Sequence, residues 1–384
     1  MKFIAKTFHG LEEVLAEELV ALGATNVEPI RRAVYFEGNH SVLYKANLYG
    51  RTILRILKPL FSFEASNEKD LYKGIYEYDW EQYISIDKTF AIDTTVKSDF
   101  FTHSKYVAYK TKDAIVDQFN KKIERRPNID VTNPDIKINV HIFKNRVNIS
   151  LDSTGESLHR RGYRDEAHIA PINEVLAAGM ILLSGWDPTT TFVDPMCGSG
   201  TLLLEAAMIA CNLPPARNRK HFNFMNWPDF DRDLWKKIKA ESEIKSFPNY
   251  KIYGSDIMRN NMGKIDRVFS KIDFSQEIRL KRKAFEQLES PGDEGIVIMN
   301  PPYGERIQLA DSIELYQMIG DQLKKNFAGF DAWIISSNLQ AIKRVGLKPS
   351  KKIVLFNGAL ECKFVKFSLY KGSKKIKQEQ IDEV

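Results

Sequence analysis

Hydrophobic residues in the first part of the chain recur at the spacings of short strands and amphipathic helices. Residues 1–8 alternate as a strand does, and over 10–23 the apolar positions fall every three or four residues, the spacing of one helix face. A returning strand is predicted over 32–37 and a second short helix over 42–49. Residues 1–55 are therefore predicted to form a small layer of strands backed by helices.

The pattern over residues 56–157 predicts a second unit of the same mixed kind. Its elements are a helix over 68–76, a strand over 89–96, a long helix over 105–123, and a hairpin of strands over 136–142 and 147–151. The lysines and tyrosines of the long helix are typical of a solvated face, but they would also suit a surface that contacts RNA phosphates and unpaired bases. The pattern alone favours the solvated face.

From residue 169 helix and strand patterns alternate, which is typical of a doubly wound parallel sheet. The predicted elements are helices over 173–183, 201–211 and 313–327, strands over 191–194, 251–257, 295–299 and 333–337, and a closing hairpin over 353–356 and 362–370. The fold class is thus α/β: an α+β front region followed by a Rossmann-like, doubly wound domain. Residues 373–384 have the composition of a basic, disordered tail.

The first strand of that domain ends in Asp194 and is followed by a turn that contains Gly198 and Gly200. Because glycine lacks a β-carbon, backbone amides in such a turn can lie directly against a ligand. A phosphate-binding loop would need a lysine after Gly200, and a dinucleotide fingerprint would need glycine in place of Leu203. An acid before the turn repels a pyrophosphate but suits a ligand with an ammonium group and a sulfonium. The turn therefore predicts a site for S-adenosylmethionine, in preference to an ordinary strand–helix turn.

The second strand ends in Asp256, from which a carboxylate can accept hydrogen bonds from both ribose hydroxyls of a nucleoside. Ile257 follows it and could cover one face of the adenine. The alternative role for Asp256 is to cap the next helix, which is common for aspartate.

The sharpest motif is Asn300-Pro301-Pro302-Tyr303, directly after the buried strand over 295–299. Consecutive prolines fix the backbone, so that the Pro301 carbonyl and the Asn300 side-chain oxygen can accept both hydrogens of an exocyclic amine. Such bonds aim the nitrogen lone pair at a methyl donor, and Tyr303 offers a stacking face for the base, worth about 1–3 kcal/mol. The motif predicts an amino-methyltransferase loop, in preference to a rigid turn.

Composition and charge allow this chemistry without requiring it. The 384 residues are enough for two or three domains, and a net charge of +6 with a pI near 8.9 permits a polyanionic partner. The three cysteines are widely spaced and form no zinc-binding pattern, so we expect a reducing compartment and no metal. No signal region is recognisable and the best apolar run is too short for a membrane span, so a cytoplasmic location is expected.

The turn over 194–200 and the loop over 300–306 together resemble class I amino-methyltransferases that act on RNA. The resemblance implies a catalytic loop made of Asn300, Pro301, Pro302 and Tyr303. It implies a cofactor site made of Asp194, Pro195, Cys197, Gly198, Ser199, Gly200, Asp256, Ile257, Asn300 and Asn173. Family members often place an acid after the third strand to hold the adenine amine, whereas here 279–285 contains none before Glu286.

The whole chain is similar to the THUMP-containing methyltransferases that modify guanine N2 in large-subunit ribosomal RNA. The similarity implies a ferredoxin-like part over 1–55, a THUMP-like RNA-binding domain over 56–157 and a methyltransferase domain over 158–372. Residues 158–176 also resemble the segment that flanks the cofactor in that family. The implied activity is methyl transfer from S-adenosylmethionine to the N2 amine of a guanine in RNA, with 23S ribosomal RNA as the first choice of substrate.

Two basic stretches are candidates for RNA contact. The first lies near residue 160, where arginines could bind phosphate or pair with acids across the domain junction; the second lies in an insertion over 211–250. The aromatic residues of the insertion could stack on bases or form a small core of their own. The candidate RNA-binding residues are Arg160, Arg161, Arg164, Arg217, Arg219 and Lys220.

Three other functions remain possible from the sequence. The same chemistry could act on transfer RNA, and the same loop would accept the N6 amine of adenine in DNA or RNA. The front region argues against a DNA enzyme, because DNA methylases of this type carry recognition domains of a different layout. A non-catalytic RNA-binding assembly factor is the alternative from another class, and the intact loop over 300–303 argues against it.

Overall fold

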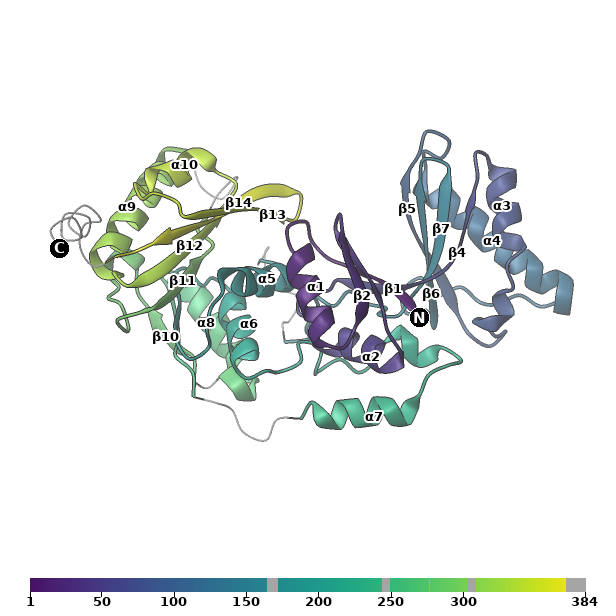
Figure 1. Ribbon diagram of the computed structural model, residues 1–384, viewed down its shortest axis with the longest axis horizontal. Helices are drawn as coiled ribbons and strands as arrows, with labels where there is room; N and C mark the ends of the chain where they lie inside the picture. The colour runs from purple at the N-terminus through teal and green to yellow at the C-terminus, as the bar shows by residue number, and fades with distance from the viewer. Residues whose placement is uncertain (164–171, 244–248, 276, 303–308, 371–384) are drawn as a thin grey trace, which may run out of the picture. The chain divides into compact units, whose positions relative to one another are not determined.

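Figure 1 presents the computed structural model of the chain, which describes residues 1–163, 172–243, 249–275, 277–302 and 309–370. The chain forms two compact units. Unit 1 consists of Met1–Thr7, Leu15–Leu158 and Arg219–Glu241, and unit 2 consists of Phe8–Val14, His159–Asn218 and Ser242–Val384. Each unit contains a seven-stranded sheet. Among the described helices, none is long and apolar enough to cross a membrane.

The sheet of unit 1 has the strand order β2-β3-β1-β4-β7-β6-β5. Its strands are β1 (Lys2–Lys6), β2 (Thr25–Ile30), β3 (Ala33–Glu37), β4 (Arg55–Glu64), β5 (Phe90–Lys97), β6 (Ile136–Phe143) and β7 (Arg146–Asp152). Its helices are α1 (Glu12–Ala21), α2 (His40–Tyr49), α3 (Glu68–Tyr76) and α4 (Ser104–Ile123). Only the residues of α1 from Leu15 onward belong to this unit. The predicted hairpin is confirmed, because β6 and β7 pair antiparallel.

One long strand, β4, joins the two halves of this sheet. Its first residues pair with β1, with Leu57 opposite Ile4, and the rest of the strand pairs with β7, with Phe61 opposite Ile149. The ferredoxin-like and THUMP-like parts therefore share one continuous sheet. Strand β2 has no counterpart among the predicted elements, because none of its residues is buried and it lacks the alternation of apolar and polar residues that marks a half-buried strand.

The insertion belongs to unit 1 from Arg219 to Glu241, where it ends in helix α7 (Arg232–Glu241). The ring of Phe224 stacks on that of Tyr44 in α2 with 4.5 Å between centroids. The Asp231 amide donates a hydrogen bond of 2.9 Å to the Tyr44 hydroxyl, and Trp235 packs edge-on against Tyr44. The aromatic residues Phe222, Phe224 and Trp227 are buried. Of the two interpretations of these rings, the small core is confirmed.

The sheet of unit 2 has the order β10-β9-β8-β11-β12-β14-β13. The strands are β8 (Thr191–Asp194), β9 (Ile252–Asp256), β10 (Arg279–Arg282), β11 (Gly295–Met299), β12 (Phe330–Ser336), β13 (Lys351–Asn357) and β14 (Leu360–Ser368). The helices are α5 (Glu174–Ser184), α6 (Thr201–Ala210), α8 (Arg259–Phe269), α9 (Leu309–Asn326) and α10 (Leu339–Arg344). The first five strands of that order are parallel and β14 is antiparallel to both neighbours, so the predicted doubly wound sheet with a closing hairpin is confirmed.

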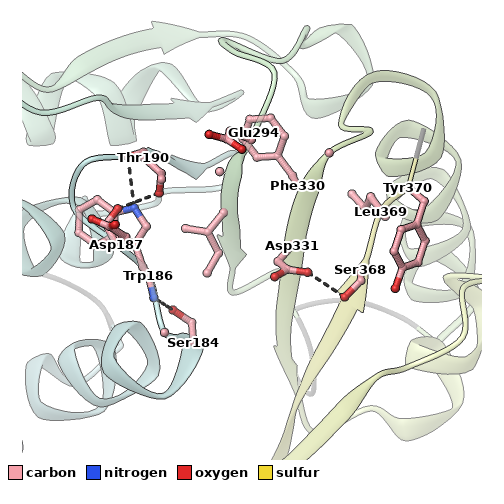
Figure 2. Close-up of a pocket in the computed structure, with 14 residues that line it drawn as sticks. Ser184, Trp186, Asp187, Thr190, Glu294, Phe330, Asp331, Ser368, Leu369 and Tyr370 are labelled. Atoms are coloured by element: carbon pink, nitrogen blue, oxygen red, sulfur yellow. Dashed lines mark hydrogen bonds between the residues drawn. The ribbon is translucent and has the colours of Figure 1, made fainter.

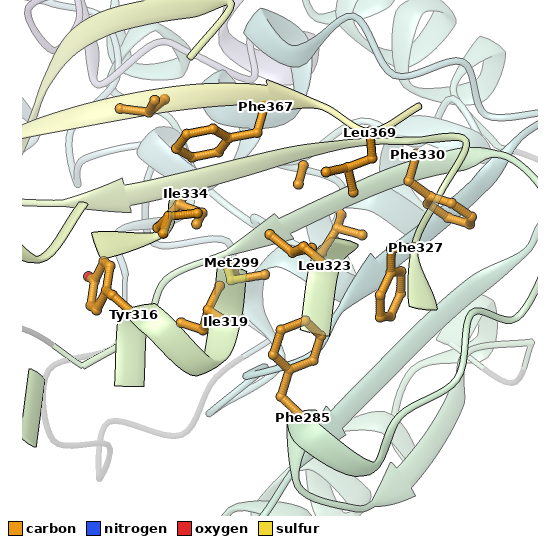
Figure 3. Close-up of a cluster of buried hydrophobic side chains, with 14 of the residues drawn as sticks. Phe285, Met299, Tyr316, Ile319, Leu323, Phe327, Phe330, Ile334, Phe367 and Leu369 are labelled. Carbon is orange, nitrogen blue, oxygen red and sulfur yellow. The ribbon is translucent and has the colours of Figure 1, made fainter. Parts of the chain in front are cut away.

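A cluster of buried side chains fixes β11 and β12 against α9 (Figure 3). Met299 at the end of β11 lies among Ile319 and Leu323 of α9 and Ile334 of β12, and all four are fully buried. Burying a side chain of this size contributes about 1.5–3 kcal/mol. The packing of Met299 against α9 therefore fixes the end of β11, from which Asn300 follows.

Candidate active site

The strand register brings the predicted site residues to one edge of the sheet in unit 2. Strand β8 lies between β9 and β11, with Asp194 opposite Gly254 and Val193 opposite Val297. Asp256 and Asn300 therefore follow on either side of the end of β8, about 10 Å apart across two strand spacings. Strands β9 and β10 lie on one side of β8 and β11 and β12 on the other, so the strand order reverses at β8. In open α/β sheets ligands bind outside the carboxyl ends of the strands at such a point.

The glycine turn after β8 needs its glycines for two different reasons. Both Gly198 and Gly200 have positive φ angles, 53° and 76°. A β-carbon at Gly200 would come within 3.1 Å of the Phe269 ring, whereas one at Gly198 would meet nothing within 4 Å. The Cys197 amide donates to the Ser255 carbonyl at 2.9 Å, which ties the turn to β9. Gly198 thus presents bare backbone to open space at the carboxyl edge of the sheet, as a ligand cradle requires.

Two carboxyl groups stand beside this turn. Asp194 is 1% exposed; burial raises the pKa of its carboxyl to about 8, the Asp256 carboxylate also raises it, and a hydrogen bond from the Met196 amide opposes the rise. Asp256 accepts hydrogen bonds from the Gly198 amide at 2.9 Å and the Met258 amide at 2.8 Å. In the part of the chain that the structure describes, neither forms an ion pair with Lys, Arg or His. The site therefore favours a cationic ligand.

The Asn300 side chain carries a hydrogen-bond acceptor at this edge of the sheet. Its side-chain oxygen is buried, and within the described ranges no donor lies within hydrogen-bond distance of it. An unsatisfied buried acceptor costs about 1–3 kcal/mol, a cost that a bound donor at this edge of the sheet would remove. Pro301 is buried and Pro302 half-buried; Tyr303 lies outside the described residues. Asn300 is thus ready to accept a hydrogen bond from a bound amine.

Of the other predicted cofactor residues, Pro195 and Ser199 lie in the same turn, whereas Asn173 lies at the start of α5. Pro195 accepts a hydrogen bond from the Ser255 hydroxyl at 3.1 Å, and the Ser199 hydroxyl lies 3.2 Å from that of Thr201. Asn173 caps α5, and its side-chain oxygen accepts from the Val175 amide at 2.9 Å.

Cys197 and Ile257 differ in what they can offer a ligand. Burial raises the pKa of the Cys197 thiol well above its usual range, and Asp194 and Asp256 add to the rise, so the thiol stays protonated. Ile257 is 62% exposed, although it is a large apolar residue next to Asp256. Its position suits the predicted role of covering an apolar ligand surface. No group of three or more His, Cys, Asp or Glu side chains in the described residues could hold a metal.

Arg161 requires a correction. We expected it to contact phosphate, but its guanidinium is buried and its Nε lies 3.3 Å from Glu205 Oε1 on α6. The Tyr163 hydroxyl donates to the same carboxylate oxygen at 2.9 Å. Arg161 therefore has no solvent-facing surface for RNA. The signal in the sequence was Glu205, an acid on the inward face of an otherwise apolar helix. Arg160 is exposed, and Arg164 lies outside the described residues.

Replacing Arg161 with methionine is expected to lower the free energy of unfolding by about 3 kcal/mol, because the buried Glu205 carboxylate loses its guanidinium partner. Urea denaturation would measure it. The double variant Arg161→Met/Glu205→Leu should recover most of that loss, since two apolar side chains carry no desolvation cost. A loss below about 0.5 kcal/mol, as for an ordinary surface substitution, would contradict this account.

The basic residues of the insertion also divide into two kinds. Arg219 donates through its guanidinium to the carbonyls of Thr154, Glu156 and Ser157, so its prediction as a phosphate ligand is corrected to a structural role in unit 1. Arg217 is half-buried and lies 3.3 Å from Asp273 in unit 2. Lys220 is exposed, and its role as an RNA contact stays a prediction.

A separate cleft of about 520 Å³ opens at the other edge of the same sheet (Figure 2). Thr190, Glu294 and Phe330, which line it, lie at or next to the amino ends of β8, β11 and β12. Ser368 donates to Asp331 there at 2.8 Å, as Figure 2 shows. Because parallel α/β sheets bind ligands at their carboxyl ends, we assign no role in the chemistry to this cleft.

Family models match the chain in three consecutive parts. The RlmL ferredoxin-like domain matches residues 2–57, the THUMP domain matches 65–152, and the methyltransferase domain described as RMKL-like matches 161–366.

Similar proteins extend over nearly the whole chain. A protein of Synechocystis sp. assigned as an RNA methyltransferase is 39% identical over 371 residues, which cover 96% of this chain and 97% of the relative. The crystal structure of SMU.472 in complex with S-adenosylhomocysteine has a TM-score of 0.87 at 30% identity and covers 97% of this chain and 99% of that one. A methylase structure from Clostridium difficile 630 gives the same TM-score, identity and coverage.

Proposed function

Since the chain belongs to the RMKL-like family of THUMP-domain RNA methyltransferases, which use S-adenosylmethionine, we propose that it methylates the exocyclic N2 amine of a guanine in RNA. Large-subunit ribosomal RNA, 23S in bacteria, is the proposed substrate. The choice of guanine and of ribosomal RNA rests on the resemblance of the whole chain, from the ferredoxin-like part to the Asn300 loop.

The observation that carries the proposal is the buried side-chain oxygen of Asn300, which has no hydrogen-bond donor among the described residues and lies at the same edge of the sheet as the glycine turn. We propose that Asn300 Oδ1 and the Pro301 carbonyl accept the two hydrogens of the target amine. These bonds weaken conjugation of the nitrogen lone pair with the ring and fix its direction, so that catalysis is mainly orientation. Tyr303 is proposed to stack on the base.

The residues that would bind the cofactor are proposed from the charge of their side chains and the shape of the glycine turn. Bound S-adenosylmethionine supplies an electrophilic methyl group on a sulfonium. Asp194 and Asp256 would supply the negative charge for its cationic part and the acceptors for its ribose, and Gly198 would lie against it without a side chain. These residues therefore fit the cofactor chemically as well as by family.

The substrate nucleotide must be unpaired or turned out of its helix, because the N2 amine is occupied in a base pair and an enzyme cannot reach it inside a duplex. The exposed basic residues Arg160 and Lys220 are proposed RNA contacts. They would act on the phosphate backbone, which contributes affinity and salt dependence rather than sequence choice.

Methyl transfer to total RNA from cells that lack the protein tests the proposal. The purified full chain is incubated with that RNA and S-adenosylmethionine labelled in its methyl group, and the nucleosides are then separated by chromatography. We expect labelled N2-methylguanosine in a fragment of the large ribosomal RNA. Label in transfer RNA would show that transfer RNA is the substrate, and label in N6-methyladenosine would show that the target base is adenine. RNA binding without methyl transfer would contradict an enzymatic function.

The affinity for S-adenosylmethionine is expected to rise with pH up to about 8 and then level off. In the ligand-free protein the Asp194 carboxyl has a pKa of about 8, so below that pH it is mostly protonated and must lose a proton to hold a cation. Linkage then predicts that Kd falls by up to about tenfold per pH unit below the pKa. Isothermal titration calorimetry at pH 6, 7, 8 and 9 would measure it.

Asp194→Asn is the matched control, because it keeps the shape of the side chain and cannot ionise. Its Kd should be nearly independent of pH, and the slope that remains belongs to the amino group of the ligand. A wild-type profile with the same slope as this variant would show that Asp194 does not titrate on binding.

A further inference from the structure

A chain of hydroxyl and amide groups links α9 to the end of β12. Ser336 is the last residue of β12, and its Oγ accepts a hydrogen bond of 2.7 Å from the Tyr316 hydroxyl on α9. The Asn338 backbone amide donates to the same Ser336 oxygen at 3.0 Å, and the Asn338 side-chain amide donates to Ser312 Oγ on α9 at 3.0 Å. The remaining oxygen of Asn338 caps α10 by accepting from the Ala341 amide at 2.9 Å. Every polar atom of the Asn338 side chain is therefore in use.

Three of the four side chains are buried, and Asn338 is half-buried. Tyr316 and Ser336 are fully buried and Ser312 is 1% exposed. Figure 3 shows the Tyr316 ring beside Ile319 and Ile334, at one margin of the hydrophobic cluster. Burial raises the pKa of Tyr316 to about 12, so its hydroxyl remains a donor at any physiological pH. Buried polar networks of this kind fix a single geometry, since their hydrogen bonds are lost if the elements shift.

The network lies beside the loop that begins at Asn300. Strands β11 and β12 are parallel, with Met299 opposite Ile334, so Pro301 continues from β11 at the level of Ser336. Helix α9 is the next described element after Pro302. The hydrogen bonds thus join the strand beside Asn300 to the helix that follows its loop.

We propose that Ser312, Tyr316, Ser336 and Asn338 are positioning residues for the two acceptors of the Asn300 loop, an inference that rests on the proposed function. They do not contact substrate. They hold β12 and α9 at a fixed separation, and that separation sets where Asn300 Oδ1 and the Pro301 carbonyl stand. A misplacement of about 1 Å in a reacting geometry can lower the rate about 100-fold, so loss of one of these hydrogen bonds should lower kcat.

Tyr316→Phe tests the proposal against Tyr250→Phe as the matched control. Tyr250 is also a buried tyrosine of unit 2, but its hydroxyl donates to the Phe274 carbonyl near the amino end of β9, at the opposite edge of the sheet. Each substitution removes one buried hydrogen bond, so the two variants should lose similar stability. We expect Tyr316→Phe alone to lower kcat, by about tenfold, at unchanged affinity for S-adenosylhomocysteine.

A second variant separates positioning from helix capping. Asn338→Ser keeps an N-cap side chain for α10 but removes the amide that donates to Ser312. It should lower kcat as Tyr316→Phe does, again without a change in cofactor affinity.

Both measurements use the full chain. Calorimetry with S-adenosylhomocysteine gives the cofactor affinity, and methyl transfer to the RNA substrate gives kcat. Equal kcat values for Tyr316→Phe and Tyr250→Phe, or a fall confined to cofactor affinity, would overturn the inference. Asn300→Ala distinguishes this failure from failure of the proposed function. If Asn300→Ala is inactive while Tyr316→Phe is normal, only the positioning role is wrong; if Asn300→Ala is active, the proposed loop chemistry itself is wrong.

Discussion

Asn300→Ala is expected to lower kcat by about 10²- to 10³-fold and to leave the affinity for S-adenosylhomocysteine unchanged. The loss corresponds to removal of one preorganised hydrogen-bond partner from a catalytic site. The Asn300 side-chain oxygen already lies buried without a donor among the described residues, so the variant should not lose stability and could gain some. Single-turnover methyl transfer measures the rate constant of the chemical step without interference from product release, and it should fall by the same factor.

Asn300→Asp provides the comparison for this variant. It keeps an acceptor oxygen at the same distance along the side chain and should retain much more activity than Asn300→Ala. Near-normal turnover of Asn300→Ala would contradict the proposed contact with the target amine. Equal and complete inactivity of both variants, with normal melting curves, would point to a need for the asparagine amide group instead of its oxygen.

Asp194→Ala is expected to raise the Kd for S-adenosylmethionine by about 100-fold, because a charge-assisted hydrogen bond is worth up to about 3 kcal/mol. The carboxyl stands at the end of β8, where the turn after it leaves open space next to Gly198. The kinetic signature should be the opposite of that of Asn300→Ala. KM for the cofactor rises, and kcat returns towards the wild-type value when the cofactor is in excess.

A change in kcat at saturating cofactor, with an unchanged Kd, would contradict the role given to Asp194. Asp187→Ala is a suitable control, because Asp187 is also an aspartate of unit 2 but lines the cleft at the amino edge of the sheet. It should change neither Kd nor kcat.

Local patterns in the sequence determined most of the secondary structure and the identity of the candidate loops. The helix over 68–76 and the strand over 191–194 have the predicted bounds, because their apolar spacing is complete within a few residues. The glycine turn and the Asn300 loop are equally local, since their chemistry depends on residue types at adjacent positions. Spacing also predicted the parallel sheet, as helix and strand patterns alternate from residue 169.

Tertiary structure decided what depends on contacts between distant residues. Arg161 and Arg219 look like phosphate ligands in the sequence, and only their partners Glu205 and the Thr154 carbonyl place them in structural roles. The sequence could not assign residues 219–241 to unit 1, because the Tyr44 ring that receives them is far away along the chain. Charge is visible in a sequence, but burial is not.

The same reason applies to the candidate site. The sequence named Asp194, Asp256 and Asn300 separately, and the order of parallel strands brought them to one edge of the sheet. It gave no sign of the network around Ser336, because isolated Ser and Tyr residues carry no pattern until a strand and a helix lie side by side. The sequence therefore determined which groups could do the chemistry, and the pairing of strands decided which of them stand together and what holds them in place.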